Sequence, residues 1–257
     1  MDFLHKKTAL NPLDLYHGYD YAEFWEGRSY EDSADKIAIS RLLSLIDTHH
    51  NKILDLGVGI GRIMPIYQNL WKNLILVDSS LWQIKELQKK KFTNSSVEVL
   101  EGAADNIPIS SEGCDTLLCV RVFHHINNTK LVIKEMYRVL ELRGYVVLEI
   151  PNKLHFKNRL ASFFRKNGDF YSEGKVNIAI NNQDVVFLNH SPKFIKRQLM
   201  SQGFQIVETL SVSNFRLPFL KRFIPLPVLI RLEKIVQKPF ALFWFGPSIY
   251  FLAKKIS

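Results

Sequence analysis

Glycines and a carboxylate follow two successive apolar runs in the first third of this 257-residue chain. In "ILDLGVGIGR", residues 53–62, an apolar run ends near an acid, and glycine then occupies positions 57, 59 and 61. Asp78 closes the next apolar run, "NLILVD". In a doubly wound sheet the carboxyl ends of parallel strands meet at one edge, where ligands bind. We therefore expect Gly57, Gly59, Gly61 and Asp78 to share a site, with the acid accepting hydrogen bonds from ribose hydroxyl groups.

The glycine spacing narrows the choice of nucleoside. A dinucleotide site prefers G-x-G-x-x-G, in which the last glycine lets a helix N-terminus approach a pyrophosphate. Here the spacing is G-x-G-x-G, and Arg62 stands where that last glycine would be. This misfit counts against NAD and FAD. An aminoacyl nucleoside carries an ammonium and a carboxylate instead of phosphates, and a turn beside Asp55 suits it better. The alternative is a tight turn whose glycines serve backbone angles alone.

Alternating strands and helices are predicted around these motifs and indicate an α/β fold. Apolar spacing favours an amphipathic helix at 31–47 and further helices at 61–71, 81–91, 129–140 (closed by Gly144) and 191–203, the last capped by Ser191. Strands are expected at 52–57, 73–80, 96–104, 114–122, 144–152, 205–213 and 247–255. Cys114 and Cys119 lie in one strand at an odd separation. We therefore expect them on opposite faces, with neither a disulfide nor a metal site.

Two segments, 153–190 and 213–245, interrupt this alternation. One domain with two insertions on the substrate side fits the pattern, with a lid at 1–50 and a cofactor-binding core at 51–152. Charge divides unevenly: the chain carries +9 overall, as −3 over residues 1–152 and +12 over residues 153–257. Such asymmetry indicates an anionic partner, such as a membrane face, a phosphorylated substrate or nucleic acid, or else a solvated basic face. No secretory signal is evident, so a cytoplasmic protein is expected.

Several longer stretches share one family pattern. "ILDLGVGIGR" is similar to its first motif, "LILVDSS" to its ribose-binding acid, and "EGAADNIPISSEGCDTLLCVRVFHHI" to its third and fourth motifs. "EMYRVLELRGYVVLEIPN" resembles the helix and strand that follow, and "SQGFQIVETL" with "GPSIYFLAKK" resembles a closing antiparallel hairpin. The chain thus resembles the class I S-adenosylmethionine-dependent methyltransferases, specifically the small-molecule group with the ubiquinone and menaquinone biosynthesis enzymes. The likeness is close over 19–152 and looser over 191–212 and 246–255. It implies a doubly wound, seven-stranded, mostly parallel Rossmann-like sheet with a terminal antiparallel strand.

This resemblance also implies an enzyme that uses S-adenosylmethionine, and it assigns roles to residues. Those near the methionine moiety are Asp55, Gly57, Gly59 and Arg121, and those near the ribose and adenine are Asp78, Ser79, Ser80, Ala103 and Ala104. Gly61 and Arg62 complete the glycine loop. "YDYAEFWEGRSY" resembles the family's lid, which makes Tyr21, Trp25, Arg28 and Tyr30 candidates for cofactor contact. Where the family commonly has a G-D-A turn, this chain has Gly102-Ala103-Ala104, so the hydrogen bond to the adenine amino group is missing or supplied by Asp105.

Two histidines are the candidate catalytic residues. A sulfonium is an activated methyl donor, so alignment of the acceptor and exclusion of water supply most of the catalysis. His124 and His125 follow the fourth strand, and either imidazole could act as a base if the acceptor is a hydroxyl group or an acidic carbon. The alternative is a structural His-His pair. Tyr171, His190 and Asn152 are weaker candidates for substrate contact. No metal is expected.

The two insertions are expected to define the acceptor. "FKNRLASFFRKNGDFY" and "RLPFLKRFIPLPVLIRLEKIVQKPFALFWF" mix basic with apolar residues, as segments on an anionic bilayer do. A lipid-linked acceptor fits that reading, while a cap over the site or a dimer interface is the alternative. RNA methylation is disfavoured, because "RVFHHI" replaces the Asn/Asp-Pro-Pro-aromatic signature of base-amino methylation. A non-catalytic binding protein with the same fold is the third hypothesis.

Overall fold

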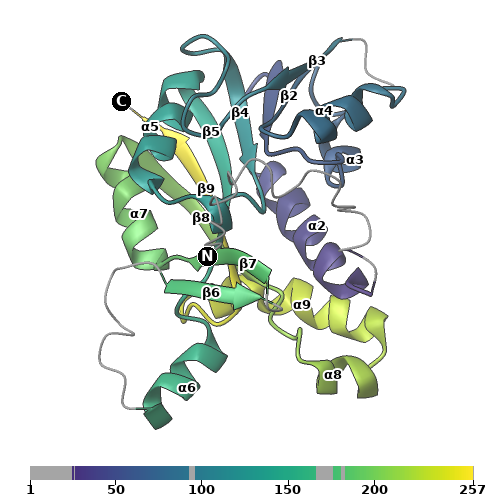
Figure 1. Cartoon of the computed structure of the whole chain (residues 1–257), viewed down its shortest axis with the longest axis vertical. Helices are drawn as coiled ribbons and strands as arrows, with labels where there is room; N and C mark the ends of the chain where they lie inside the picture. Colours follow the sequence, from purple (N-terminus) through teal and green to yellow (C-terminus); the bar gives the residue numbers. More distant parts are fainter. Residues whose placement is uncertain (1–24, 26, 93–95, 166–175, 181–182, 257) are drawn as a thin grey trace, which may run out of the picture.

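The computed structural model describes residues 25, 27–92, 96–165, 176–180 and 183–256 (Figure 1). A seven-stranded sheet runs through its centre in the order β3-β2-β1-β4-β5-β9-β8. The strands span Lys52–Leu56 (β1), Asn73–Asp78 (β2), Ser96–Glu101 (β3), Cys114–Cys119 (β4), Leu140–Pro151 (β5), Phe204–Val212 (β8) and Ser248–Lys255 (β9). Pairing is parallel from β3 to β5, whereas β9 runs antiparallel to both β5 and β8. The order reverses next to β1, which confirms the predicted doubly wound, mostly parallel fold.

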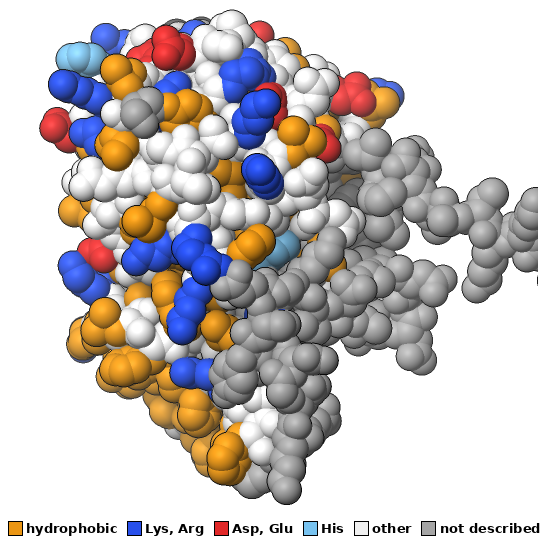
Figure 2. All heavy atoms as spheres, turned by 90° about the vertical axis from the view of Figure 1, so that its left-hand side faces the viewer, with side chains coloured by type: hydrophobic (Ala, Val, Ile, Leu, Met, Phe, Trp, Pro, Cys, Tyr) orange, Lys and Arg blue, Asp and Glu red, His pale blue; other side chains and the backbone are white. Residues whose placement is uncertain are grey.

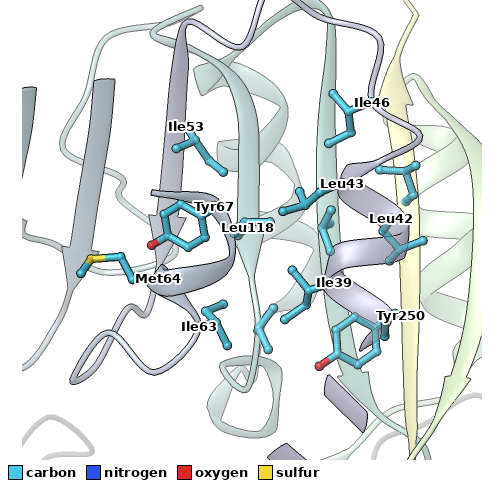
Figure 3. Packing of buried hydrophobic residues seen from close by; sticks show 14 of the residues in the cluster. Ile39, Leu42, Leu43, Ile46, Ile53, Ile63, Met64, Tyr67, Leu118 and Tyr250 are labelled. Atoms are coloured by element: carbon cyan, nitrogen blue, oxygen red, sulfur yellow. The ribbon is translucent and has the colours of Figure 1, made fainter. Parts of the chain in front are cut away.

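Helices cover both faces of this sheet, as a parallel sheet requires (Figure 1). They span Ser29–Leu43 (α2), Met64–Tyr67 (α3), Leu81–Gln88 (α4), Thr129–Val139 (α5) and Pro192–Ser201 (α7). On one face, α2 packs Ile39, Leu42 and Leu43 towards β1 and β4 (Figure 3). On the other face, α5 and α7 bury a second apolar cluster against the same strands. The central strands are therefore covered on both sides, and their carboxyl ends remain available for a site.

The two insertions carry regular structure. The first contains α6 (Phe156–Arg165) and a two-stranded antiparallel sheet of β6 (Val176–Ile180) and β7 (Gln183–Asn189). The second contains α8 (Pro218–Phe223) and α9 (Leu226–Ala241). Helix α9 packs against α2 and β8, and α6 and α8 lie at the same end of the molecule (Figure 1). These helices and strands were not predicted, because no clear periodicity of apolar residues marks them in the sequence.

Three local predictions were wrong. Only Met64–Tyr67 of the helix expected at 61–71 is helical. The helix before β5 ends at Val139, not at Gly144, and β5 begins at Leu140. A Cβ on Gly144 would lie 2.9 Å from the carbonyl oxygens of Asp115 and Glu141, so the strand itself requires this glycine.

The cysteines form the third wrong prediction. Cys114 and Cys119 are both free, but both belong to the same apolar cluster instead of facing opposite ways. The register of β4 against β5 shifts between Cys114 and Thr116. A register irregularity of this kind breaks the two-residue alternation of a strand, so an odd separation no longer implies opposite faces.

Candidate cofactor site

The glycine loop after β1 is hydrogen-bonded to β2 and has a backbone conformation that favours glycine. The amide of Gly57 donates to the carbonyl of Val77 at 2.7 Å, and Gly57, Gly59 and Gly61 all have positive φ. A side chain on Gly57 would overlap Val122, whereas no atom of the described residues lies within 4 Å of the position that a Cβ on Gly59 would take. Gly57 is thus required by packing, and Gly59 leaves free space at the wall of a cleft.

Asp78 lies on the same cleft, at the carboxyl end of β2. Its carboxylate accepts hydrogen bonds from the amide of Gly59 at 2.8 Å and from the amide of Ser80 at 2.9 Å. Burial raises the pKa of Asp78, and these amide donors oppose the rise. The predicted meeting of the loop and the second-strand acid is therefore present, with Ser79 beside it.

Asp55 reaches the cleft from within β1. It is buried, and the hydroxyl of Tyr67 donates to its Oδ2 at 2.5 Å. Burial raises the pKa of Asp55 to about 7, the Tyr67 hydrogen bond opposes that rise, and the charge of Asp78 adds to it. Asp55 therefore titrates near neutral pH, and a cation in the cleft would favour its charged form.

A buried carboxylate on α2 joins two arginines of the cleft. Asp35 is fully buried and accepts from Nη2 of Arg62 at 3.0 Å. It also accepts from Nη2 and Nε of Arg121, at 2.9 and 3.2 Å. Arg121 lies within 3.7 Å of the Glu149 carboxylate and donates to the Ser248 hydroxyl at 3.2 Å. This network ties the lid helix to the ends of β4, β5 and β9.

The lid residues divide between the cleft and the protein interior. The guanidinium of Arg62 lies 3.8 Å from the centroid of the Trp25 ring, and that of Arg121 lies 5.8 Å from it. Arg28 stands at the N-cap of α2 and is exposed. Tyr30 instead points away from the cleft and donates to Glu233 on α9 at 2.6 Å. Tyr21 lies outside the described residues.

The histidine pair follows β4 in a 3₁₀ turn, Phe123–His125. The two rings lie 3.8 Å apart, and Phe187 of β7 packs against both. His125 lines the cleft, and His124 is not among the described residues that line it. Burial lowers the pKa of His125 to about 4, and burial with the charge of His125 lowers that of His124 well below its usual value. Both imidazoles are therefore neutral at pH 7.

Other predicted residues lie beside the cleft or serve the fold. Gly61 lies against Leu87, and Ala103 pairs with Asn106 in an isolated bridge; neither they nor Ala104 are among the cleft-lining residues. Asn152 is buried and donates to the carbonyls of Trp244 and Gly246. His190 is buried with Nε2 2.7 Å from the carbonyl oxygen of Phe123. Tyr171 lies outside the described residues.

Sequence reasoning missed three polar residues of this region. Gln83 lines the cleft from α4, and its buried Oε1 has no hydrogen-bond partner among the described residues. Asp35 and Glu149 hold Arg121. A signal existed for two of them: Asp35 interrupts the apolar face of an amphipathic helix, and Glu149 interrupts the run "YVVLEIP". Buried acids in such places need partners.

Comparison with known proteins agrees with this arrangement. A family model described as "Methyltransferase domain" matches residues 54–148, which run from β1 through β5. Residues 54–148 therefore form a methyltransferase domain of the class I S-adenosylmethionine-dependent type. An uncharacterised methyltransferase of Schizosaccharomyces pombe is 37% identical over 97 residues, covering 37% of each chain. A demethylmenaquinone methyltransferase of Thermotoga maritima is 25% identical over 177 residues, covering 63% of this chain and 73% of that protein.

A solved structure shares the methyltransferase fold. The crystal structure of a putative S-adenosylmethionine-dependent methyltransferase from Listeria monocytogenes superposes with a TM-score of 0.62 at 17% identity, covering 87% of this chain and 99% of that one. Among curated relatives, by contrast, the chain spans little more than a third of the fungal protein.

The residues of the cleft fit the cofactor of this family, S-adenosylmethionine. Three features suit a ribose and a nucleobase: the open position at Gly59, the acid at the end of β2, and the amide oxygen of Gln83, which no described residue binds. Asp55 offers a carboxylate to a cationic centre, and Arg62 and Arg121 offer cations to a carboxylate.

Proposed function

We propose that this methyltransferase moves the methyl group of S-adenosylmethionine to a small or lipid-linked acceptor by direct in-line displacement. The observation that carries the proposal is the contact between Asp78 and the amide of Gly59, at 2.8 Å, in a cleft that also exposes His125. It brings a ribose-type carboxylate, an open glycine turn and a neutral imidazole to one sheet edge. The family model and the named relatives support the same reaction class.

The chain's own residues have distinct tasks in this proposal. When bound, the cofactor supplies an activated methyl group on a sulfonium centre. Asp78 and Ser79 hold the ribose, and Gly57 and Gly59 let the backbone approach the methionine part closely. The Asp55 carboxylate favours a cation near the loop. Ala103 and Ala104, on the turn after β3, lie at the adenine side, and Gly61 shapes the helix end of the loop.

The arginines and the lid close the methionine side. Arg62 and Arg121 are held by Asp35, so their positions are fixed before a ligand arrives. Trp25 lies over both guanidinium groups, and Arg28 stands at the entry of α2. Such pre-organised cations favour a carboxylate at small entropic cost. The same lid excludes water, which alignment of the acceptor requires.

His125 is the proposed catalytic base, with His124 as the residue that positions its ring. A neutral imidazole accepts a proton without losing one first, and burial keeps His125 neutral at physiological pH. Its lowered pKa makes it a weak base. This suits an acceptor that is already acidic, such as a phenolic hydroxyl group or an activated ring carbon.

The nature of the acceptor follows from the relatives and from the insertions. Relatives named for demethylmenaquinone and ubiquinone/menaquinone methylation point to a prenylated aromatic ring. Helix α6 begins at Phe156, shortly after β5 ends at Pro151, and it exposes Phe156, Leu160 and Phe163. We therefore propose a ring acceptor with an apolar tail, in preference to a nucleic acid.

A transfer assay tests this function. The purified chain is incubated with tritiated S-adenosylmethionine and demethylmenaquinol in detergent micelles, with bulk tRNA as the competing acceptor. We expect label in the quinol fraction, loss of transfer in Asp78→Asn, and a decrease of at least about tenfold in His125→Gln. Label in tRNA alone, or no transfer to either despite cofactor binding, would reject the proposal in favour of an RNA enzyme or a non-catalytic protein.

A further inference from the structure

Apolar side chains project from three helices at one end of the molecule, and we call this surface the docking face. All exposed phenylalanines in the described part of the chain belong to it. The docking face comprises Phe156, Leu160 and Phe163 of α6, Phe219 and Phe223 of α8, Leu226, Val228, Leu232 and Ile235 of α9, and Leu242 and Phe243 after α9. Figure 2 shows hydrophobic side chains gathered at this end, with lysines and arginines beside them.

Aromatic contacts join the three elements beneath this surface. The rings of Phe156 and Phe245 are stacked with centroids 5.1 Å apart, and Phe240 of α9 lies 4.5 Å from Phe245. Phe215, before α8, lies 6.3 Å from Phe240. This row fixes α6 and the region before α8 against α9, so the docking face is one built surface instead of separate loose helices.

The exposed apolar residues are too prominent for ordinary surface scatter. Phe219 and Phe223 are 69% and 66% exposed, and they stand one turn apart on α8 with centroids 4.9 Å apart. Phe163 is 77% exposed, and it shares one face of α6 with Phe156 and Leu160 at helical spacing. Contiguous patches of this kind mark interaction surfaces in proteins.

Helix α9 has the pattern of a helix that lies in an interface. Its buried positions, Leu229, Glu233, Gln237 and Ala241, recur every four residues and face α2 and β8. At 100° per residue the outward half divides into an apolar stripe and a basic stripe. The apolar stripe contains Val228, Leu232, Ile235, Pro239 and Leu242, and the basic stripe contains Arg231, Lys234 and Lys238.

The positive charge of the docking face indicates which kind of partner it binds. The segment 216–245 carries six lysines and arginines and one acid, Glu233, which is fully buried. Two of the lysines, Lys221 and Lys238, form ion pairs with Glu31 and Glu208 outside the segment. The segment 153–165 contains no acid at all. Two copies of this chain meeting through the same face would bring like charges together, which disfavours a symmetric dimer. Apolar side chains bordered by cations suit the interface of an anionic bilayer, where rings enter the acyl boundary and cations meet headgroup phosphates.

The docking face also lies beside the lid helix. Lys221 of α8 forms an ion pair with Glu31 of α2 at 2.9 Å. Arg216, just before α8, interacts electrostatically with Glu31, with Arg28 and with Arg121 of the cleft. A membrane on this face would therefore lie next to the lid helix that borders the cofactor site.

We propose that the docking face binds the anionic surface of a lipid bilayer and so brings a bilayer-resident acceptor to the cleft. No helix among the described residues is long and apolar enough to cross a membrane. Attachment would therefore be by α6, α8 and α9 lying on the surface. The binding itself does not depend on methyl transfer, although the delivery of an acceptor rests on the function proposed above.

Vesicle flotation tests the proposal without cofactor, so it succeeds or fails independently of the transfer assay. The full chain is mixed with vesicles of phosphatidylcholine alone or with 30% phosphatidylglycerol, at low and high salt. We expect binding to the anionic vesicles and weaker binding as salt rises. The double variant Phe219→Ser/Phe223→Ser should lose at least tenfold in apparent affinity. Arg222→Glu/Arg231→Glu should bind less and show less salt dependence.

A matched control separates the docking face from general stickiness. Leu142 and Met200 are 58% and 55% exposed and lie outside the docking face, so Leu142→Ser/Met200→Ser should bind as the unmodified chain does. Equal binding by all variants, or equal binding to both vesicle types at every salt concentration, would overturn the proposal. So would a dimer in sedimentation velocity that Phe219→Ser/Phe223→Ser converts to a monomer while vesicle binding is absent.

Discussion

Asp35 on helix α2 accepts two hydrogen bonds from the Arg121 guanidinium, at 2.9 and 3.2 Å, and joins the lid helix to the end of β4. The carboxylate is fully buried and also holds Arg62. Removing one partner of a buried ion pair leaves an uncompensated charge in a poorly solvated place. The lid and the methionine side of the cleft therefore depend on one side chain.

Asp35→Asn should destabilise the protein and weaken cofactor binding together. We expect a loss of about 3 kcal/mol in the free energy of unfolding, measured in urea, because two guanidinium groups lose their shared anion. Asp32→Asn is the matched control, since Asp32 also pairs with Arg62 but lies nearer the surface, and should cost under about 1 kcal/mol. Equal costs for the two variants would contradict the central role of Asp35.

Gly57 and Gly59 should respond differently to alanine. Gly57→Ala combines positive φ with overlap of Val122, and we expect a loss of about 3 kcal/mol or more in stability. Gly59→Ala has the φ cost alone, of about 1 kcal/mol, because its side faces open space. Its methyl group would enter the cleft, so affinity for S-adenosylmethionine should fall while the fold persists. Thermal unfolding measures the stability of the two variants, and calorimetry measures their affinity for S-adenosylmethionine. Unchanged affinity in a folded Gly59→Ala protein would refute the proposal that the cofactor occupies the space beside Gly59.

Asp55 should make cofactor affinity depend on pH around neutrality. Its pKa is raised to about 7, so below that pH a bound cation must first displace a proton. Affinity for S-adenosylmethionine should therefore increase from pH 6 to pH 8, with proton release measurable by calorimetry in buffers of different ionisation enthalpy. In Tyr67→Phe a hydrogen bond that lowers this pKa is lost, and the increase should move to higher pH. Affinity that is flat across this range in both proteins would rule Asp55 out.

The buried, neutral His125 should make the protein less stable as the pH decreases. Its pKa is about 4 in the folded chain and near 6.5 when unfolded, so between these values the unfolded state binds a proton that the folded state does not. The free energy of unfolding should fall as pH decreases from 7 to 5, by about 2 kcal/mol for this group. His125→Gln should lose correspondingly less over the same interval in urea titrations. The difference between the two proteins in this change of unfolding free energy gives the contribution of His125 alone. Identical changes in both proteins would show that the pKa of His125 is not lowered by folding.

The sheet and its cofactor edge could be predicted because their signals are local. Apolar runs, glycines and terminal acids fixed β1 and β2, and the structure places Asp78 against Gly59 as that pattern implied. The antiparallel closing strand followed from the family resemblance and is confirmed by β9. These features depend on backbone geometry that few residue types satisfy.

The rest depends on contacts between distant segments. Tyr30 was a cofactor candidate, but its hydroxyl is used by Glu233 on α9, a partner 203 positions away. Asp35 gave a hint as an acid on an apolar helix face, yet its two arginine partners lie in different loops. The cysteines were misassigned because a register irregularity in β4 carries no sequence mark. Side-chain pairs between distant segments and irregularities of strand register depend on how the segments pack, and this packing cannot be read from a single sequence.

Whether the cleft beside Asp78 holds S-adenosylmethionine is decided by calorimetric titration of the folded chain, with Asp78→Asn and the exposed acid variant Asp47→Asn measured beside it. If the cleft holds the cofactor, the unmodified chain and Asp47→Asn bind saturably, and the affinity of Asp78→Asn, whose amide keeps one acceptor for the loop, decreases by at least about tenfold. Absence of binding to the unmodified chain, or equal affinity in Asp78→Asn, would contradict binding of the cofactor in this cleft.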